Sequence, residues 1–239
     1  MRSWTPEMAY VLGYLFADGS MYKSARGSYI NVTSIDKSTI EKIKSLLKSE
    51  HTIREVKPKI VHFNHQSKNY KTKTAYTLRI GNRALYEDLL RLGMYPNKSL
   101  TIGFPDVPTK ALPHFVRGYF DGDGCVYLEK GKGLTQESIL KRLSVIFTSG
   151  SEYFLTGLRE KLEESMGISQ GKVYNGNGAY RLRYNTKDTM GLFSFMYKNS
   201  HGLSLKRKFD IFKAYFHLRP SRVDRNIEKV LKQIGHVAN

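Results

Sequence analysis

The chain begins with a long apolar run of the kind that forms a buried helix. Thr5 and Pro6 provide an N-cap and first-turn signature, and almost every residue from 8 to 16 is apolar. The run stops at Asp18, which precedes a glycine, so we predict a helix that ends there. A second run from 109 to 120 repeats this pattern and predicts a second buried helix.

Alternating apolar and polar positions follow each run and predict β-strands, because successive side chains of a strand point to opposite faces. In the segment 29–33, Ile30 and Val32 face one side and the residues between them face the other. The segment 142–148 alternates in the same way. Its expected buried side chains are Leu143, Val145 and Phe147, and its expected exposed ones are Arg142, Ser144, Ile146 and Thr148.

Helical patterns and two further strands complete each half of the chain. In the second half a hairpin-turn sequence at 175–178 separates the last two strands, and Arg181 and Arg183 alternate with apolar positions on the final one. Each half therefore predicts the order αββαββα. The remaining helices are expected at 37–47 and 83–92 in the first half and at 152–166 and 187–197 in the second.

The duplicated order of elements has a counterpart in a repeated sequence. The segment Gly-Tyr-Leu-Phe-Ala-Asp-Gly at 13–19 recurs as Gly-Tyr-Phe-Asp-Gly-Asp-Gly at 118–124. Two shorter matches follow in the same order: Thr33-Ser34 with Thr148-Ser149, and 75–79 with 179–183. Three matches in one order indicate an α+β unit that is present twice.

We divide the chain into an N-terminal half, 1–106, and a C-terminal half, 107–239, with a linker near 104–108. The C-terminal half carries an additional helix from about 207 to 218. Amphipathic spacing after Pro220 predicts one more helix in the tail.

The composition adds a strong positive charge to this picture. Lys and Arg number 39 against 21 Asp and Glu, which gives a net charge of +18 over 239 residues. Mixed surfaces usually keep their net charge to about 2 to 8, so we expect a polyanionic partner. Nucleic acid is favoured over an anionic membrane surface or an acidic protein. The 40% apolar content excludes a disordered chain, and no uncharged stretch reaches the ~20 residues that span a bilayer.

The two repeated segments, 13–19 and 118–124, resemble the paired motifs of the LAGLIDADG homing endonucleases in their single-chain form. The likeness runs from Thr5 to about Leu218. It implies two pseudo-symmetric αββαββα halves, each with a four-stranded antiparallel sheet, which together form a DNA-binding saddle. It also implies that the two motif helices pack side by side, with Gly13 and Gly118 allowing their close approach.

The resemblance implies a catalytic acid at the eighth position of each motif, which is Asp18 in the first and Asp123 in the second. The two acids are expected to converge on the pseudo-two-fold axis. One departure concerns an earlier motif position, where Phe16 replaces the usual Asp while Asp121 keeps it. That position does not ligate metal in the family, so the expected activity is unaffected.

The expected activity is site-specific double-strand cleavage of DNA at a long asymmetric target, as in intron homing. Hydrolysis of a phosphodiester needs an activated water and neutralisation of the transition-state charge, and divalent metals held by carboxylates supply both. Oxygen ligands favour Mg²⁺, with Mn²⁺ as an alternative, and Ca²⁺ is expected to bind without supporting cleavage. The resemblance implies these metal ligands: the carboxylates of Asp18 and Asp123 and the carbonyls of Ala17 and Gly122.

Family sites also place a lysine near the scissile phosphate, after the third helix of each half. The matching residues are expected to be Lys98 and Lys206, which would stabilise the transition state electrostatically. Either lysine can also be interpreted as an ordinary solvated surface residue.

The sheet faces turned away from the helices are expected to read bases in the major groove, since Arg, Asn, Ser and Thr pair with base edges. The expected DNA-binding residues are Tyr22, Arg26, Tyr29, Asn31, Thr33, Thr77 and Arg79 in the first half, and Arg142, Ser144, Thr148, Arg181 and Arg183 in the second. Loop lysines are expected to contact phosphates: Lys68, Lys71, Lys73, Lys130 and Lys132.

The expected partner is double-stranded DNA, bound by a monomer that requires neither a membrane nor a protein partner. The single cysteine, Cys125, fits a reducing compartment, and no basic start followed by an apolar segment marks a signal peptide. We therefore expect a protein that is not secreted and acts on genomic DNA in the cytoplasm or an organellar matrix. Two alternatives stay open: a maturase that assists splicing of a host intron RNA, and a non-catalytic DNA-binding regulator.

Overall fold

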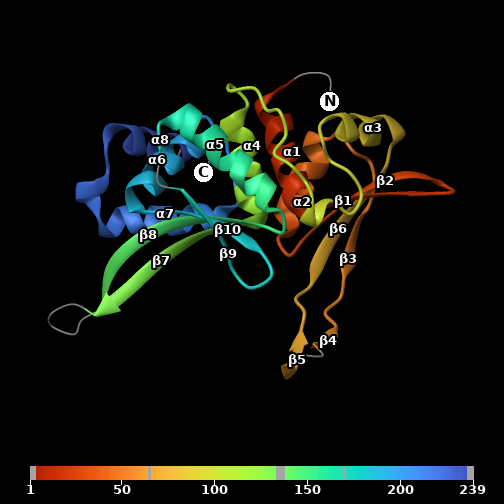
Figure 1. Ribbon diagram of the computed structural model, residues 1–239, viewed down its shortest axis with the longest axis horizontal. Helices are drawn as coiled ribbons and strands as arrows, with labels where there is room; N and C mark the ends of the chain where they lie inside the picture. Colours follow the sequence, from red (N-terminus) through yellow and green to blue (C-terminus); the bar gives the residue numbers. More distant parts are fainter. Residues whose placement is uncertain (1–3, 64–65, 133–137, 169–170, 236–239) are drawn as a thin grey trace. The chain divides into compact units, whose positions relative to one another are not determined.

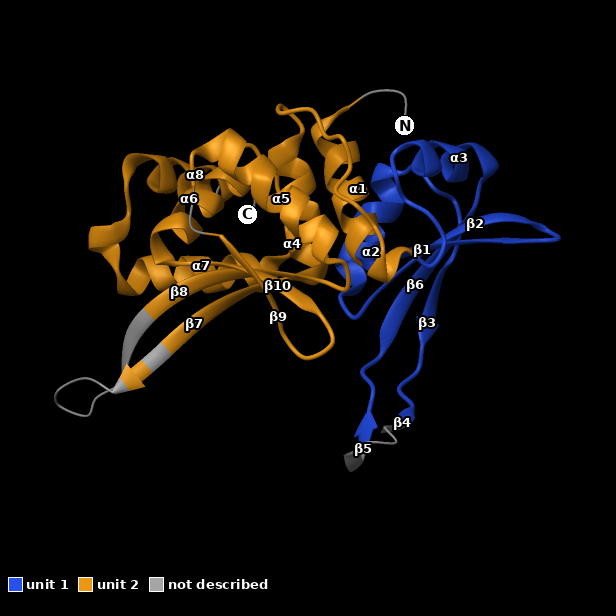
Figure 2. Cartoon of the chain, viewed as in Figure 1, with its two compact units in different colours: residues 1, 18–97 blue, residues 2–17, 98–239 orange. Residues whose placement is uncertain are grey.

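The computed structural model describes residues 4–63, 66–132, 138–168 and 171–235 (Figure 1). It confirms the expected α+β class with a four-stranded antiparallel sheet in each half. The chain forms two compact units (Figure 2). One comprises residues 18–97, and the other comprises residues 2–17 together with 98–239.

The first unit is a sheet whose strands run in the order β1-β2-β6-β3. Two helices pack on one face of it, and a hairpin that the sequence pattern did not predict extends between β3 and β6. The sheet strands are β1 (Gly19–Ser24), β2 (Gly27–Ser34), β3 (Ile53–Val56) and β6 (Ala75–Gly81); the helices are α2 (Lys37–Leu46) and α3 (Arg83–Arg91); the hairpin is β4 (Ile60–Phe63) with β5 (Gln66–Lys71).

Burial in this sheet follows the predicted alternation. Ile30 and Val32 on β2 and Leu78 and Ile80 on β6 are all buried on the face that contacts α2 and α3. The polar and aromatic side chains between them therefore lie on the opposite face of the sheet, away from α2 and α3.

The second unit has the same sheet order, β7-β8-β10-β9, and more helices. Leu143, Val145, Phe147 and Leu182 are completely buried on its inner face, as the alternation predicted. Its strands are β7 (Gly124–Lys132), β8 (Ser138–Ser149), β9 (Lys172–Asn175) and β10 (Tyr180–Tyr184). Its helices are α4 (Leu112–Asp123), α5 (Glu152–Met166), α6 (Thr186–Tyr197), α7 (Lys206–Leu218) and α8 (Arg225–Gly235), with the 3₁₀ turns η1 (Lys98–Leu100) and η2 (Pro220–Arg222).

The first motif helix, α1 (Pro6–Asp18), contributes all but its last residue to this second unit, because it packs directly on α4. A Cβ atom on Gly13 would lie 2.0 Å from the carbonyl oxygen of Phe115, and one on Gly118 would lie 2.0 Å from that of Tyr10. Only glycine permits backbones this close. The boundaries of the compact units thus differ from the predicted division at residue 106. That division stays a prediction about the sequence repeat.

None of the helices in the described residues combines the length and the apolarity needed to cross a membrane.

Candidate catalytic centre and nucleic-acid interface

Both motif helices end in an aspartate that is followed at once by a strand. Asp18 closes α1 and is exposed, whereas Asp123 closes α4 and is half-buried. The last carbonyls of a helix have no partner within the helix and carry its partial negative charge. Ala17 and Gly122 supply such carbonyls immediately before each acid, so each helix end offers a cation both a carboxylate and a backbone oxygen.

A buried lysine contacts the carbonyls at each of these helix ends. The Lys98 ammonium donates to the carbonyl of Phe16 at 2.6 Å and approaches that of Ala17 at 3.4 Å, and its residue is 5% exposed. On α4 the equivalent ammonium belongs to Lys208, which is 3% exposed. Lys208 contacts four carbonyl oxygens: Phe120 at 2.5 Å, Asp121 at 2.8 Å, Gly122 at 3.2 Å and Gly124 at 2.5 Å.

The structure therefore puts Lys208, and not the expected Lys206, in the position that corresponds to Lys98. The Lys206 side chain is 85% exposed and forms an ion pair with Asp210 at 2.6 Å, one turn along α7. The sequence could not separate these two lysines, because they lie two positions apart at the start of one helix. Only the packing of α7 in the second unit shows which of them faces α4.

The earlier motif aspartate, Asp121, ties three segments of the second unit together. It is 1% exposed, and one of its carboxylate oxygens accepts hydrogen bonds from the Tyr10 hydroxyl and the Leu205 amide, both at 2.8 Å. Burial raises the pKa of Asp121 to about 6, although the nearby Lys208 ammonium acts in the opposite direction. A carboxylate this enclosed holds α1, α4 and the start of α7 in place.

Arg117 on α4 is completely buried and forms a second internal anchor. Its guanidinium donates to the carbonyls of Met196 at 2.5 Å and Leu203 at 2.6 Å, and it contacts His114 Nδ1 at 3.1 Å. Burial, with the neighbouring Arg117 charge, lowers the pKa of His114 to about 4. His114 is therefore neutral near pH 7 and accepts at Nδ1.

The residues at the helix ends fit a magnesium-type ion. Among the described residues no group of three or more His, Cys, Asp or Glu side chains could hold a metal. The motifs instead offer oxygen donors only, namely one carboxylate and one carbonyl each. This sparse set suits Mg²⁺ or Mn²⁺, which keep several waters and use phosphate oxygens. A carbonyl has two lone pairs, so the lysine contact at Gly122 leaves one for an ion.

The free face of the first sheet brings the predicted reading residues together in cross-strand pairs. Tyr22 stacks on Tyr29 with ring centroids 5.2 Å apart, and the Arg79 guanidinium lies 4.1 Å from the centre of the Tyr29 ring. Thr33 and Thr77 share a hydrogen bond of 2.8 Å between their hydroxyls. Pairing in the sheet places Asn31 beside Arg79, while Arg26 is exposed near the turn between β1 and β2. The seven predicted residues thus lie on β1, β2 and β6 or at the turn that joins β1 to β2.

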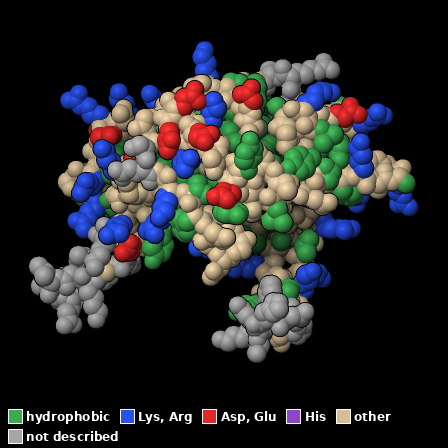
Figure 3. Space-filling model, viewed as in Figure 1, with side chains coloured by type: hydrophobic (Ala, Val, Ile, Leu, Met, Phe, Trp, Pro, Cys, Tyr) green, Lys and Arg blue, Asp and Glu red, His purple; other side chains and the backbone are tan. Residues whose placement is uncertain are grey.

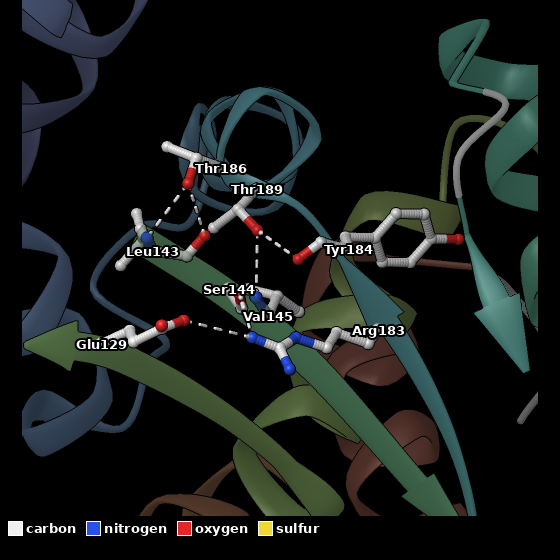
Figure 4. A network of polar contacts seen from close by, with 8 residues as sticks. All are labelled: Glu129, Leu143, Ser144, Val145, Arg183, Tyr184, Thr186 and Thr189. Atoms are coloured by element: carbon white, nitrogen blue, oxygen red, sulfur yellow. Dashed lines mark hydrogen bonds and ion pairs between the residues drawn. The ribbon is translucent and has the colours of Figure 1, made fainter. Parts of the chain in front are cut away.

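The free face of the second sheet contains one correction. Ser144, expected to be exposed, is only 2% exposed, and it accepts a hydrogen bond from Arg183 at 3.2 Å (Figure 4). Glu129 on β7 lies 4.0 Å from the same guanidinium. Ser144 therefore positions Arg183 and is covered itself. Arg142 and Arg181 are exposed, and Thr148 is half-buried opposite Arg181.

The edge strands add polar residues that the sequence reasoning missed. Arg54 on β3 pairs with Thr77, while Lys172 and Tyr174 on β9 pair with Arg183 and Arg181. The turn at 175–178 sets the register of β9 against β10, so this signal could have identified the last two. Lys71 and Lys73 are exposed, whereas the side chains of Lys68, Lys130 and Lys132 lie outside what the structure describes.

Comparison with protein families finds one matching model, the LAGLIDADG-like domain, over residues 5–92 and 112–194. The two matched segments fall one in each predicted half. A search of the curated protein sequences finds no match to this chain.

Comparison with solved structures finds the same fold. The I-LtrWI LAGLIDADG homing endonuclease bound to target DNA has a TM-score of 0.58 and 14% identity, over 98% of this chain and 97% of its own. I-DmoI in complex with DNA and Ca has a TM-score of 0.50 and 16% identity, over 81% and 90%. The N-terminal LAGLIDADG domain of DUF199/WhiA has a TM-score of 0.50 and 14% identity, over 81% and 82%. At these identities the likeness establishes the fold alone.

Proposed function

Because the chain belongs to the LAGLIDADG-like domain family, we propose that it is a site-specific endonuclease that cuts both strands of a DNA duplex. The observation that carries the proposal is the duplicated helix end. Two helices that pack through glycine each end on an aspartate, and a buried lysine from another element donates to the carbonyls beside each acid. One such end is explained by helix capping, whereas two in a repeated motif favour a pair of reactive centres.

In this proposal Asp18 and Asp123 each hold a divalent metal for the cut in one strand, with the carbonyls of Ala17 and Gly122 as further ligands. A bound Mg²⁺ supplies an activated water and neutralises charge on the phosphate. The neighbouring I-DmoI structure, which is described with DNA and Ca, supports a divalent ion at sites of this fold.

We assign the two buried lysines to the same centres. Lys98 and Lys208 fix the carbonyls that precede each acid, and their charge favours the anionic transition state. Lys208 takes the role that the sequence suggested for Lys206.

DNA binding is proposed for the free faces of the two sheets and for the positive charge around them. Figure 3 shows Lys and Arg side chains distributed over the face that it draws, with fewer Asp and Glu among them. With a net charge of +18, phosphate contacts supply affinity, while the side chains on the sheet faces supply base preference. A duplex bound by a monomer follows from the presence of both motifs in one chain.

The proposal is tested by removing one charge at a time from the acids. A cleavage selection on a randomised DNA library with Mg²⁺ first supplies the target. Asp18→Asn or Asp123→Asn should then abolish double-strand cutting and leave specific binding within about threefold of the original, because metal-binding carboxylates act on chemistry more than on docking. Asp106→Asn, which alters an exposed aspartate of the linker, is the control and should cut normally. Undiminished cutting by either motif variant would refute the assignment.

A second candidate function is a DNA-binding regulator without catalysis, which would use the same sheet faces and the same positive charge. A binding selection on the same DNA library, with no cleavage step, separates the two. A protein that enriches one DNA sequence by binding, yet cuts it in neither Mg²⁺ nor Mn²⁺, is a regulator. In a separate binding measurement, tighter binding of an intron RNA than of any selected DNA duplex would indicate a maturase.

A further inference from the structure

A basic pocket lies at the edge of the second sheet, beside the surface proposed to read bases. Its walls come from β8, β9 and β10, the start of α6, the end of α7 and the turn η2, and its volume is about 850 Å³. Six of its lining residues are cationic: Arg142, Lys172, Arg183, Lys187, Arg219 and Arg222. No Asp or Glu is among the residues that the structure places in its lining.

The sheet wall of this pocket is held in a fixed shape. Arg183 is positioned by the Ser144 hydroxyl and by Glu129 on β7 (Figure 4). The hydroxyl of Thr186 accepts from the Leu143 amide at 3.1 Å and donates to the Leu143 carbonyl at 3.0 Å. These bonds dock the start of α6 on β8, so the cations are presented by a wall that needs little rearrangement to bind a ligand.

The charge of the pocket identifies the class of ligand. Six cations around one space repel one another, and the Glu129 carboxylate, 4.0 Å from Arg183, offsets part of this repulsion. An anion with several negative oxygens relieves it. Four of the six cations are arginines, whose planar guanidinium matches phosphate through paired hydrogen bonds.

We propose that this pocket binds phosphate groups of the DNA strand next to the bases read by the second sheet. The inference rests on the proposed function, because it takes DNA as the ligand. Its location supports a backbone phosphate over a free one: Arg142 and Arg183 belong both to the pocket and to the free face of the sheet. A duplex lying on that face thus has the pocket directly beside it.

The proposal makes the segment after α7 part of the DNA-binding surface. Arg219 and the turn η2, which carries Arg222, line the pocket together with the strands of the sheet. This gives the C-terminal region a role that base reading by the strands does not require.

The experiment compares two double variants that remove the same charge. The pocket variant is Lys187→Gln with Arg222→Gln, and the control is Lys213→Gln with Lys229→Gln, which changes exposed lysines of α7 and α8 outside the lining. Affinity for a selected target duplex and for an unrelated duplex is measured at several salt concentrations. A second arm titrates inorganic pyrophosphate by calorimetry.

Each lost phosphate contact reduces the slope of log K against log salt by about 0.9. For the pocket variant, the magnitude of this slope should therefore fall by about two on both duplexes alike, since phosphates carry no sequence information. For the control, it should fall by less than half of that. Equal slope changes in the two variants would show a general charge effect and overturn the proposal. Pyrophosphate binding that only the pocket variant loses, with unchanged DNA slopes, would assign the pocket to a free phosphate ligand and overturn it too.

These outcomes are separate from those of the proposed function. A protein that cuts no DNA refutes the endonuclease, yet its slope on unrelated duplex DNA still measures the pocket. A protein that cuts its target while both variants behave alike refutes the pocket alone.

Discussion

Two lysines more than one hundred positions apart make equivalent contacts at the residue scale. Lys98 and Lys208 both leave solvent and donate to carbonyls at the end of a motif helix. Burying an ammonium is costly unless its hydrogen bonds are made. The last carbonyls of a helix lack helical partners, so each lysine supplies a donor to such groups, although the Phe120 carbonyl also accepts the Gly124 amide.

Replacing Lys208 should therefore weaken the fold far more than replacing its neighbour. Lys208→Met leaves several carbonyls at the end of α4 without a donor, and we expect the free energy of unfolding to fall by about 3 kcal/mol. Lys206→Met removes only an exposed ion pair on α7 and should cost less than about 0.5 kcal/mol. Urea unfolding of the two variants measures the difference. Equal losses would show that the carbonyl contacts of Lys208 are not important for stability.

At the scale of elements, the contact between α1 and α4 depends on two glycines. The backbones approach so closely that any side chain at Gly118 meets the Tyr10 carbonyl. The close approach of the two helix backbones thus requires a residue without a side chain in each helix. This explains why a glycine stands at the same place in both motifs.

Gly118→Ala should separate the two helices or strain them. We expect a loss of at least about 2 kcal/mol in unfolding free energy, because the new Cβ would meet backbone atoms that cannot move aside singly. Gly191→Ala is the matched control in the interior of α6. Its Cβ would lie 3.5 Å from the nearest atom of Met166, and the better helix propensity of alanine should leave stability unchanged or raise it by up to about 1 kcal/mol. A similar effect at both sites would exclude the steric argument.

At the scale of the whole molecule, the two sheets share their topology and differ in the side chains they present. The free face of the first sheet carries stacked tyrosines, Asn31 and a threonine pair, whereas Arg142, Arg181 and Arg183 mark the second. Two unlike surfaces in one chain favour a DNA target whose halves differ.

Binding to palindromes tests this asymmetry. Two duplexes are built from the selected target, each with one half-site inverted and repeated, and their affinities are compared with the original. Each mismatched base pair typically costs about 1 to 3 kcal/mol, so several mismatches should weaken either palindrome by at least about a hundredfold. A palindrome bound as tightly as the original would mean that the two faces read the same bases.

The sequence by itself determined the order of the helices and of the strands in the two large sheets, the inner faces of β2 and β8, and the repeat that carries the two motif aspartates. These features depend on periodicity and on short repeats, which are local properties of the chain. The apolar alternation at Ile30 and Val32 predicted their burial because only a two-residue period places both on one face.

Tertiary structure alone decided between Lys206 and Lys208, covered Ser144, and put Arg222 and Arg183 in the lining of one pocket. Each of these outcomes joins residues about 40 or more positions apart. Helix and strand periods say which face of an element a residue occupies, and they carry no information on which distant element meets that face. The packing of α7 and η2 in the second unit supplies that information, and with it the lysine at α4 and the basic pocket.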